Sequence, residues 1–284
     1  MKKFLFSSVL ILCMLSGFAQ SKPAYRIYTS KGKAVSYKKM VSSLIKQDIV
    51  LFGELHNNPI AHWLEFELAQ SLAEKRELIL GAEMLEADNQ QVLNQYLASE
   101  ISFRALDTLA RLWPNYYTDY SPGVNSARCQ SRPFVATNIP RRYARMVHYQ
   151  GFEALDSLSQ EEKAWIAPLP IPFDPTLPTY QSILEMMGDH GSPKLVKAQA
   201  SKDATMAHFI LANYSPGKLF YHLNGSFHSD HHEGIVWYLK QSKPALNYAT
   251  ISTVSQADIS KLGEDNKGLA DFIIVVDEDM TTTY

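Results

Sequence analysis

The sequence predicts an α/β fold, a three-layer α/β/α sandwich with a mainly parallel sheet and a smaller helical subdomain. Two observations predict it. Short apolar runs typical of buried strands alternate with amphipathic helical patterns, most clearly towards the two ends of the chain. Two of these runs also end in the same form of tetrapeptide, Gly-x-x-His, at 53–56 and 225–228. A chain of 284 residues can bury such a core without disulfide support.

The first 19 residues have the pattern of a signal peptide. Lys2 and Lys3 form a basic start, and the apolar run at 4–15 is short for a membrane span. Small residues at 17–19 then suit cleavage by a signal peptidase. We therefore expect an exported protein whose mature part, residues 20–284, forms one domain without a transmembrane helix.

Cysteine usage and charge exclude several classes of protein. Cys13 lies in the apolar run, but Leu12 before it is larger than a lipidation motif prefers, so lipid anchoring is disfavoured. Cys129 is the only other cysteine, which excludes an intramolecular disulfide and a cysteine-rich metal site. A net charge of −2 without basic clusters argues against nucleic acid as a partner.

Six segments are expected to form the sheet. They are apolar runs bounded by turn residues, at 48–52, 77–80, 133–137, 218–223, 248–252 and 271–276. After the first Gly-x-x-His, Asn58 and Pro59 supply an N-cap and a first-turn proline. A helix is therefore expected from there to about Lys75.

The helical subdomain is expected from residues 86–131 and 141–190. The first segment carries apolar residues at helical spacing. The second contains a proline-rich tract at 167–175, which must be extended. A long helix is then expected from Ser192 and Pro193 to about Ala212.

Four residues at predicted strand ends are candidates for chemistry: Glu54, His56, Glu83 and His228. Ligands bind at the carboxyl edge of parallel α/β sheets, and glycine at a strand end allows a sharp turn or a close approach. Glutamate and neutral histidine suit a divalent metal ion or general acid–base catalysis. The alternative is a set of buried, hydrogen-bonded residues without activity.

Other histidines lie near these motifs in the sequence. His231 is a further candidate metal ligand, or a group that supports a ligand, because it follows His228 closely. We expect His232 to be exposed, His222 to be a hydrogen-bonded interior residue, and His62 to be a packing or surface histidine. Asp203 lies on the long helix and could face the site from there.

A loop rich in aromatic residues occupies positions 113–122. Tyr116, Tyr117 and Tyr120 lie between two prolines. A phenolate can bind ferric haem iron, and aromatic faces stack on a porphyrin. The alternative is a packed loop between helices.

Six short motifs, in order along nearly the whole mature chain, resemble those of the ChaN family of exported haem-binding proteins. They are LFGELH at 51–56, GAEM at 81–84, YSP at 120–122, ATNIPR at 136–141, DATMA at 203–207 and NGSFH at 224–228. That family is similar to the wider Tiki superfamily, whose hallmark is two Gly-x-x-His motifs and a glutamate. The matches here are Gly53 to His56, Glu83, and Gly225 to His228.

The resemblance implies a role in haem or iron uptake outside the cytoplasm, in the periplasm or at the outer membrane. It implies haem held between two subunits through a tyrosine, a homodimer when loaded, and an outer-membrane receptor as a further partner. Among the tyrosines, we expect the ligand in the 116–120 loop. The superfamily also contains hydrolases, so the alternative is a metal-dependent hydrolase that uses the four-residue cluster. A third reading is a scaffold that has lost both activities.

Overall fold

A computed structural model of the chain describes residues 22–188 and 192–284. The expected signal peptide, Cys13, and the end of the second helical segment at 189–190 lie outside the described residues. Among the residues described, no helix is both long and apolar enough to cross a membrane.

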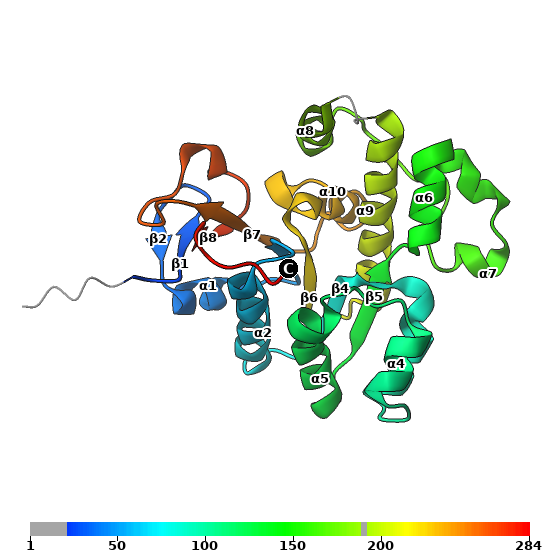
Figure 1. Cartoon of the computed structure of the whole chain (residues 1–284), viewed down its shortest axis with the longest axis horizontal. Coiled ribbons are helices and arrows are strands. Elements are labelled where there is room, and N and C mark those ends of the chain that lie inside the picture. The colour runs from blue at the N-terminus through cyan, green and yellow to red at the C-terminus, as the bar shows by residue number, and fades with distance from the viewer. Residues whose placement is uncertain (1–21, 189–191) are drawn as a thin grey trace, which may run out of the picture.

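Eight strands form one sheet in the order β2-β1-β8-β7-β3-β6-β4-β5 (Figure 1). They are β1 (Tyr25–Thr29), β2 (Ala34–Val35), β3 (Ile49–Glu54), β4 (Leu78–Glu86), β5 (Phe134–Asn138), β6 (Leu219–Gly225), β7 (Tyr248–Gln256) and β8 (Phe272–Asp277). The six strands from β8 to β5 run parallel to their neighbours, and β1 and β2 add an antiparallel edge. The fold is therefore α/β with a mainly parallel sheet, as predicted.

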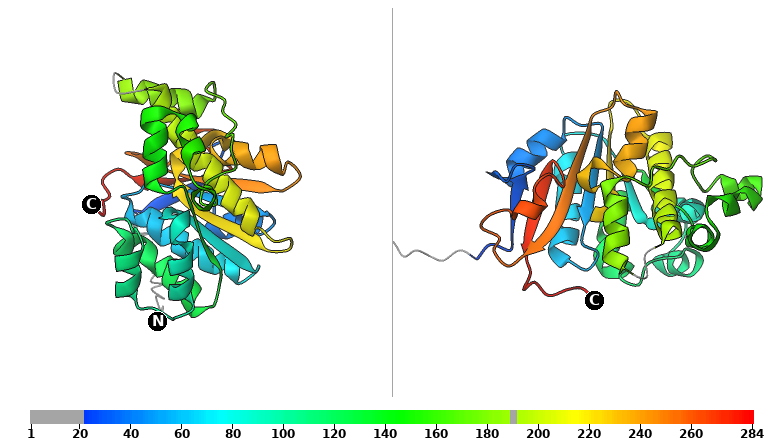
Figure 2. Two further views of the ribbon diagram at one scale, coloured as in Figure 1. Left: turned by 90° about the vertical axis from the view of Figure 1, so that its right-hand side faces the viewer. Right: turned by 90° about the horizontal axis from the view of Figure 1, so that it is seen from above.

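Helices cover both faces of the sheet, which makes three layers (Figure 2). They are α1 (Tyr37–Leu44), α2 (Pro59–Ala73), α3 (Gln90–Leu97), α4 (Phe103–Leu109), α5 (Ser121–Cys129), α6 (Arg141–Gln150), α7 (Gln160–Lys163), α8 (Pro178–Met187), α9 (Pro193–Asn213) and α10 (Ile235–Ser242). Short helical turns include η2 (Tyr116–Tyr120), η5 (Ser226–His228) and η6 (Asp230–His232).

Two hydrophobic cores lie on opposite faces of the sheet. Phe52 belongs to the core beneath α1, α2, α3 and α5, and Leu51 to the core beneath α6, α9 and α10. Adjacent side chains of a strand point to opposite faces, so β3 contributes to both. Residues 86–131 pack mainly on the first core and residues 141–188 mainly on the second. The two segments meet through the ion pair of Arg142 with Asp88, and their forming one helical subdomain stays a prediction.

The register of β3 and β6 places the two Gly-x-x-His motifs side by side. The two strands are parallel neighbours, with Gly53 opposite Asn224 and Glu54 opposite Gly225. All six β3 residues are buried, which a strand covered on both faces requires. The two motifs therefore leave the sheet at the same edge, from adjacent strands.

Most expected elements are present, with two differences. Strand β4 runs to Glu86, so Glu83 lies within the strand and not beyond its end. Strands β1 and β2 were not expected, because they are short and carry no continuous apolar run. The caps of the two main helices agree with the sequence: Asn58 caps α2, and Ser192 caps α9 through Leu195 N.

Candidate functional site

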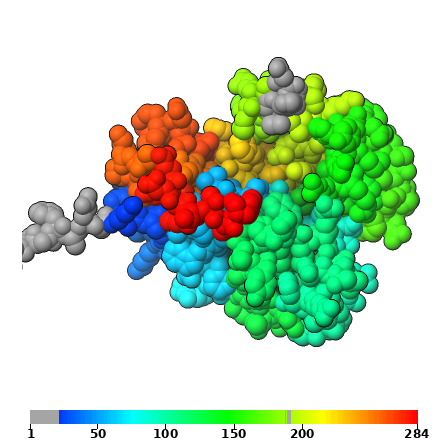
Figure 3. Space-filling view, in the orientation of Figure 1, coloured from blue at the N-terminus to red at the C-terminus, as the bar shows by residue number. Residues whose placement is uncertain are grey.

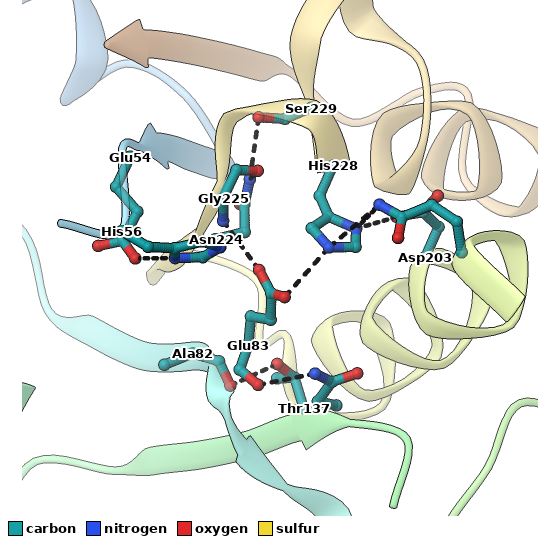
Figure 4. A network of polar contacts seen from close by, with 12 residues as sticks. Glu54, His56, Ala82, Glu83, Thr137, Asp203, Asn224, Gly225, His228 and Ser229 are labelled. Atoms are coloured by element: carbon teal, nitrogen blue, oxygen red, sulfur yellow. Dashed lines mark hydrogen bonds and ion pairs between the residues drawn. The ribbon is translucent and has the colours of Figure 1, made fainter. Parts of the chain in front are cut away.

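The four predicted residues come together towards the carboxyl ends of β3, β4 and β6 (Figure 4). His56 Nδ1 lies 2.5 Å from Glu54 Oε1, and His228 Nε2 lies 3.1 Å from Glu83 Oε1. The backbone N–H of Gly225 donates to Glu83 Oε2 at 2.8 Å. A side chain on Gly225 would place its Cβ 2.6 Å from His56 Nε2 and 3.6 Å from Glu83 Oε2. Glycine at this position therefore makes room for His56 beside Glu83.

The glycine of the first motif is required for a different reason. A Cβ on Gly53 would lie 2.9 Å from both the carbonyl oxygen of Ile251 and the Cα of Ser226. Both are backbone atoms, which cannot rotate away as a side chain can. Gly53 thus permits close packing of β3 against β7 and against the turn that carries His228.

His228 is enclosed between two carboxylates. Its Nδ1 lies 2.5 Å from Asp203 Oδ1 on α9, opposite the contact with Glu83. The hydroxyl of Tyr180 on α8 donates to Asp203 Oδ2 at 2.8 Å. His228, Glu83 and Asp203 are all buried. Asp203 thus joins the site from a helical face, which the sequence left open.

Electrostatic interactions decide which of these groups are charged. Burial would lower the pKa of His228, but the negative charges of Glu83 and Asp203 raise it to about 9. Burial would raise the pKa of Glu54, but the hydrogen bond with His56 and the close approach of His62 lower it to about 2. At neutral pH His228 is an imidazolium and Glu54 a carboxylate.

His56 is the accessible member of the cluster. Its side chain is 35% exposed, against 5% for His228. Burial would lower its pKa, but the hydrogen bond with Glu54 and the charge of Glu83 raise it. The ring of Trp113 lies edge-on to it, with centroids 5.0 Å apart. A ligand that approaches the cluster therefore meets His56 and Trp113.

A cavity of about 310 Å³ adjoins this accessible side. Trp113 lines it together with three basic residues and one acidic residue: Arg141, Arg145, Lys202 and Glu86. Lys202 also helps to lower the pKa of Glu83, although burial opposes this, so the cavity and the cluster share an electrostatic environment. The cavity is at the small end of ligand sites and suits an anionic group.

The three candidate tyrosines lie in different environments. Tyr116 and Tyr120 are buried, and the hydroxyl of Tyr120 donates to Glu54 Oε1 at 2.8 Å. Burial, with the negative charges near Tyr120, raises the pKa of both phenols. Tyr117 is 72% exposed, and its ring lies beside Phe103. The loop is thus partly a packed loop and partly an aromatic surface.

Of the remaining histidines, one lies where the sequence predicts it and one does not. His222 is a satisfied interior residue, as expected, with Thr137 Oγ1 at 2.7 Å and Asn224 Oδ1 at 3.0 Å. His232 was expected at the surface, but it is the partly buried one and pairs with Asp271 at 3.1 Å. His231, the candidate ligand, is exposed. Its role as a ligand stays a prediction.

His62 is more than the packing residue expected, and Glu65 was missed altogether. Both are buried on α2 and both approach Glu54 or one another. The signal was present in the sequence as a histidine and a glutamate three residues apart, one helical turn after the first motif. It was overlooked because the spacing is common on helices of any function.

The family follows from comparison with known proteins. The model of a family described as "Haem-binding uptake, Tiki superfamily, ChaN" matches residues 40–239. The chain belongs to the ChaN family. The match spans the strands that carry both Gly-x-x-His motifs, Glu83 and the aromatic loop. A search of the curated proteins found no match.

Solved structures agree with the fold of this ChaN-family protein. ChaN of Campylobacter jejuni, in a structure that describes cofacial haem binding, has a TM-score of 0.67 at 18% identity. The match covers 89% of this chain and 96% of that one. A Bacillus cereus protein has a TM-score of 0.52 at 11% identity, over 86% and 92% of the two chains. At such identities the likeness shows the fold alone.

Proposed function

We propose that this ChaN-family protein binds haem outside the cytoplasm and serves haem or iron uptake. Haem is held between two subunits, and a tyrosine of each subunit binds iron. The observation that carries the proposal is the exposure of Tyr117 on the aromatic loop. An iron ligand shared at a subunit interface must be accessible in the free subunit.

Tyr117 is favoured over its two neighbours by its environment. Tyr120 is engaged by Glu54, and Tyr116 stacks on Phe103 with ring planes 9° apart. Their raised pKa values oppose formation of the phenolate that binds ferric iron. Phe103 touches the Tyr117 ring as well, with centroids 5.8 Å apart, and adds an aromatic surface for a porphyrin.

The cellular setting completes the proposal. The basic, apolar start of the chain supports export, with a mature protein of residues 20–284 in the periplasm or at the outer membrane. Haem would come from, or pass to, an outer-membrane receptor. Expression of the full chain, followed by N-terminal sequencing of the periplasmic fraction, tests this part. Recovery of an uncleaved chain in the cytoplasm alone would contradict it.

A hemin titration tests the binding itself. The mature protein should develop a Soret band with tyrosinate-type ferric features, and sedimentation should show dimers that form as hemin is added. Absence of any spectral change with micromolar hemin would remove the proposal. If the protein binds hemin but stays monomeric, haem binding stands and only the binding site shared between two subunits is contradicted.

A second candidate function is supported by the cavity beside the cluster. Glu54, His56, Glu83 and His228 could activate water, as acid and base or through a divalent metal ion, next to the basic residues of the cavity. This arrangement suits hydrolysis of an ester or peptide that carries a carboxylate. Mono-p-nitrophenyl succinate should then be cleaved faster than p-nitrophenyl acetate, and His56→Ala should abolish turnover of both. No turnover of either, with Zn²⁺ or Mn²⁺ added, excludes it.

A further inference from the structure

A second carboxylate–histidine cluster lies on the inner side of Glu54. Helix α2 begins at Pro59, where the Asn58 side chain accepts from two backbone N–H groups at 3.0 Å. This start places His62 and Glu65 one turn apart on the same face of the helix. Both residues are buried, as is Glu54 at the end of β3.

The distances from His62 to its two carboxylate neighbours are close to those between ligands of one metal ion. His62 Nδ1 lies 3.0 Å from Glu54 Oε2 and 3.5 Å from Glu65 Oε2. Ligand atoms about 2.1 Å from a first-row metal ion lie about 3.0 to 3.4 Å apart in octahedral and tetrahedral sites. One ligand atom from each residue falls within 4.8 Å of the others.

Hydrogen bonding leaves part of this cluster unsatisfied. Glu54 Oε2 and Glu65 Oε1 are buried and have no hydrogen-bond partner among the described residues. The contact of His62 with Glu54 Oε2 is close, but it is not aligned as a hydrogen bond. Buried polar atoms without partners are unfavourable, and a cation between them would satisfy both carboxylates.

The second ring nitrogen of His62 contacts oxygen atoms, as the second nitrogen of a metal-binding histidine commonly does. Its Nε2 lies 3.1 Å from the carbonyl oxygen of His56 and 3.4 Å from Asp119 Oδ2. Histidine ligands commonly donate their second ring N–H to such an oxygen, which fixes the ring and directs the other nitrogen to the metal. Here that other nitrogen is Nδ1, which faces Glu54 and Glu65.

Asp119 is in turn held in place from two sides. The Asn115 amide donates to Asp119 Oδ2 at 2.7 Å, and the Thr283 hydroxyl donates to the same oxygen at 3.1 Å. The Thr283 backbone N–H also donates to the carbonyl oxygen of Asn57 at 2.9 Å. In Figure 3 this C-terminal segment, coloured red, lies over the cyan part of the surface and reaches the green part.

A small cavity adjoins the cluster. It has a volume of about 20 Å³ and is lined by His62, Glu65, Asp119 and Tyr120, together with apolar residues. One water molecule needs about 10 to 15 Å³ of such space. A water in this cavity would supply a ligand that the three protein side chains do not.

The geometry points to a buried site for one divalent first-row transition-metal ion, with Glu54, His62 and Glu65 as ligands and a water to complete it. Two carboxylates and one imidazole suit ions from Mn²⁺ to Zn²⁺. The site shares Glu54 with the Gly-x-x-His cluster but uses neither His56 nor His228. It is also separate from Tyr117, so it stands whether or not the protein binds haem.

Metal binding by the full mature chain tests this site. After treatment with chelator, titration with Co²⁺ and Zn²⁺ should give one ion per chain and a higher melting temperature. His62→Ala and Glu65→Gln should each weaken binding at least about tenfold. Glutamine keeps the shape of the Glu65 side chain but removes its negative charge, so the melting temperature of Glu65→Gln should rise little when the metal ion is added.

Two control variants locate the ion. Glu67→Gln changes a partly exposed glutamate on the same helix, and His56→Ala removes the accessible histidine of the other cluster. Glu67→Gln should retain one ion at wild-type affinity. His56→Ala removes a hydrogen-bond partner of Glu54 but no ligand, so it should still bind one ion, and more tightly than Glu65→Gln does. No binding of Co²⁺ or Zn²⁺ by the wild type, or equal binding by Glu65→Gln, would overturn the site. So would loss in His56→Ala with retention in Glu65→Gln, because the ion would then lie at the Gly-x-x-His cluster.

Discussion

The two Gly-x-x-His motifs have the same form but occupy different environments. His56 has one carboxylate partner, Glu54, and a side chain that is one-third exposed. His228 lies between Glu83 and Asp203 and is almost fully buried. The glycines differ too, because Gly225 makes room for a side chain and Gly53 for backbone.

This difference indicates that the histidines of the two motifs have different roles. The enclosed histidine holds β4, β6 and α9 together through two charged contacts, and the open one remains available to a ligand. The Gly-x-x-His sequence therefore determines where the histidine lies at the sheet edge. The side chains that contact the histidine determine whether it is structural or free to bind a ligand.

Replacing the histidine of each motif with alanine should give the largest difference in the free energy of unfolding between the motifs. His228→Ala leaves Glu83 and Asp203 buried without their cation, and should lower the free energy of unfolding by about 3 to 5 kcal/mol. His56→Ala removes a partly exposed group and should lower it by less than about 1 kcal/mol. Urea denaturation of the two variants checks this. Equal losses would show that the motifs are structurally equivalent.

The stability should also depend on pH through His228. Its pKa in the folded protein, about 9, is above that of an unfolded histidine, so protonation stabilises the fold. This contribution is complete below about pH 6.5 and is lost as the pH rises through about 9, with a magnitude of about 3 kcal/mol. Denaturation at about pH 6 and about pH 9.5 should therefore show a larger loss for the wild type than for His228→Gln. Equal losses would contradict the pairing.

Replacing the glycines of the two motifs should give the smallest difference in the free energy of unfolding between the motifs. Gly53→Ala forces backbone apart and should cost about 1 to 3 kcal/mol of unfolding free energy. Gly225→Ala meets the His56 ring, which can rotate towards solvent, and should cost less. Thermal unfolding of both variants measures the order. The opposite order would mean that His56 is held as rigidly as the backbone.

Much of the fold could be predicted because strands covered on both faces carry unmistakable apolar runs, as in β3 and β8. The meeting of Glu54, His56, Glu83 and His228 could be expected from the shared edge of parallel strands. The antiparallel edge, β1 and β2, could not, because the strands are short and only Ile27 and Tyr28 of them are buried, which leaves no clear apolar pattern.

The partners of the site were harder to predict than its place. Asp203 reaches His228 from a helix 25 residues earlier in the chain, and nothing in the spacing indicates which helical face packs inward. Tyr120, one of the candidate haem ligands, donates to Glu54, and nothing in the sequence indicates that contact. Such contacts depend on packing angles between elements, which a single sequence does not encode locally.

The absorption spectrum of bound hemin in three proteins tests most directly whether haem binds at the outer tyrosine and not at the buried cluster. Tyr117→Phe should lose the tyrosinate-type features and bind hemin more weakly. His56→Ala should give the wild-type spectrum, because the histidine is not an iron ligand in this account. A wild-type spectrum for Tyr117→Phe, together with an altered one for His56→Ala, would place the iron at the Gly-x-x-His cluster and contradict it.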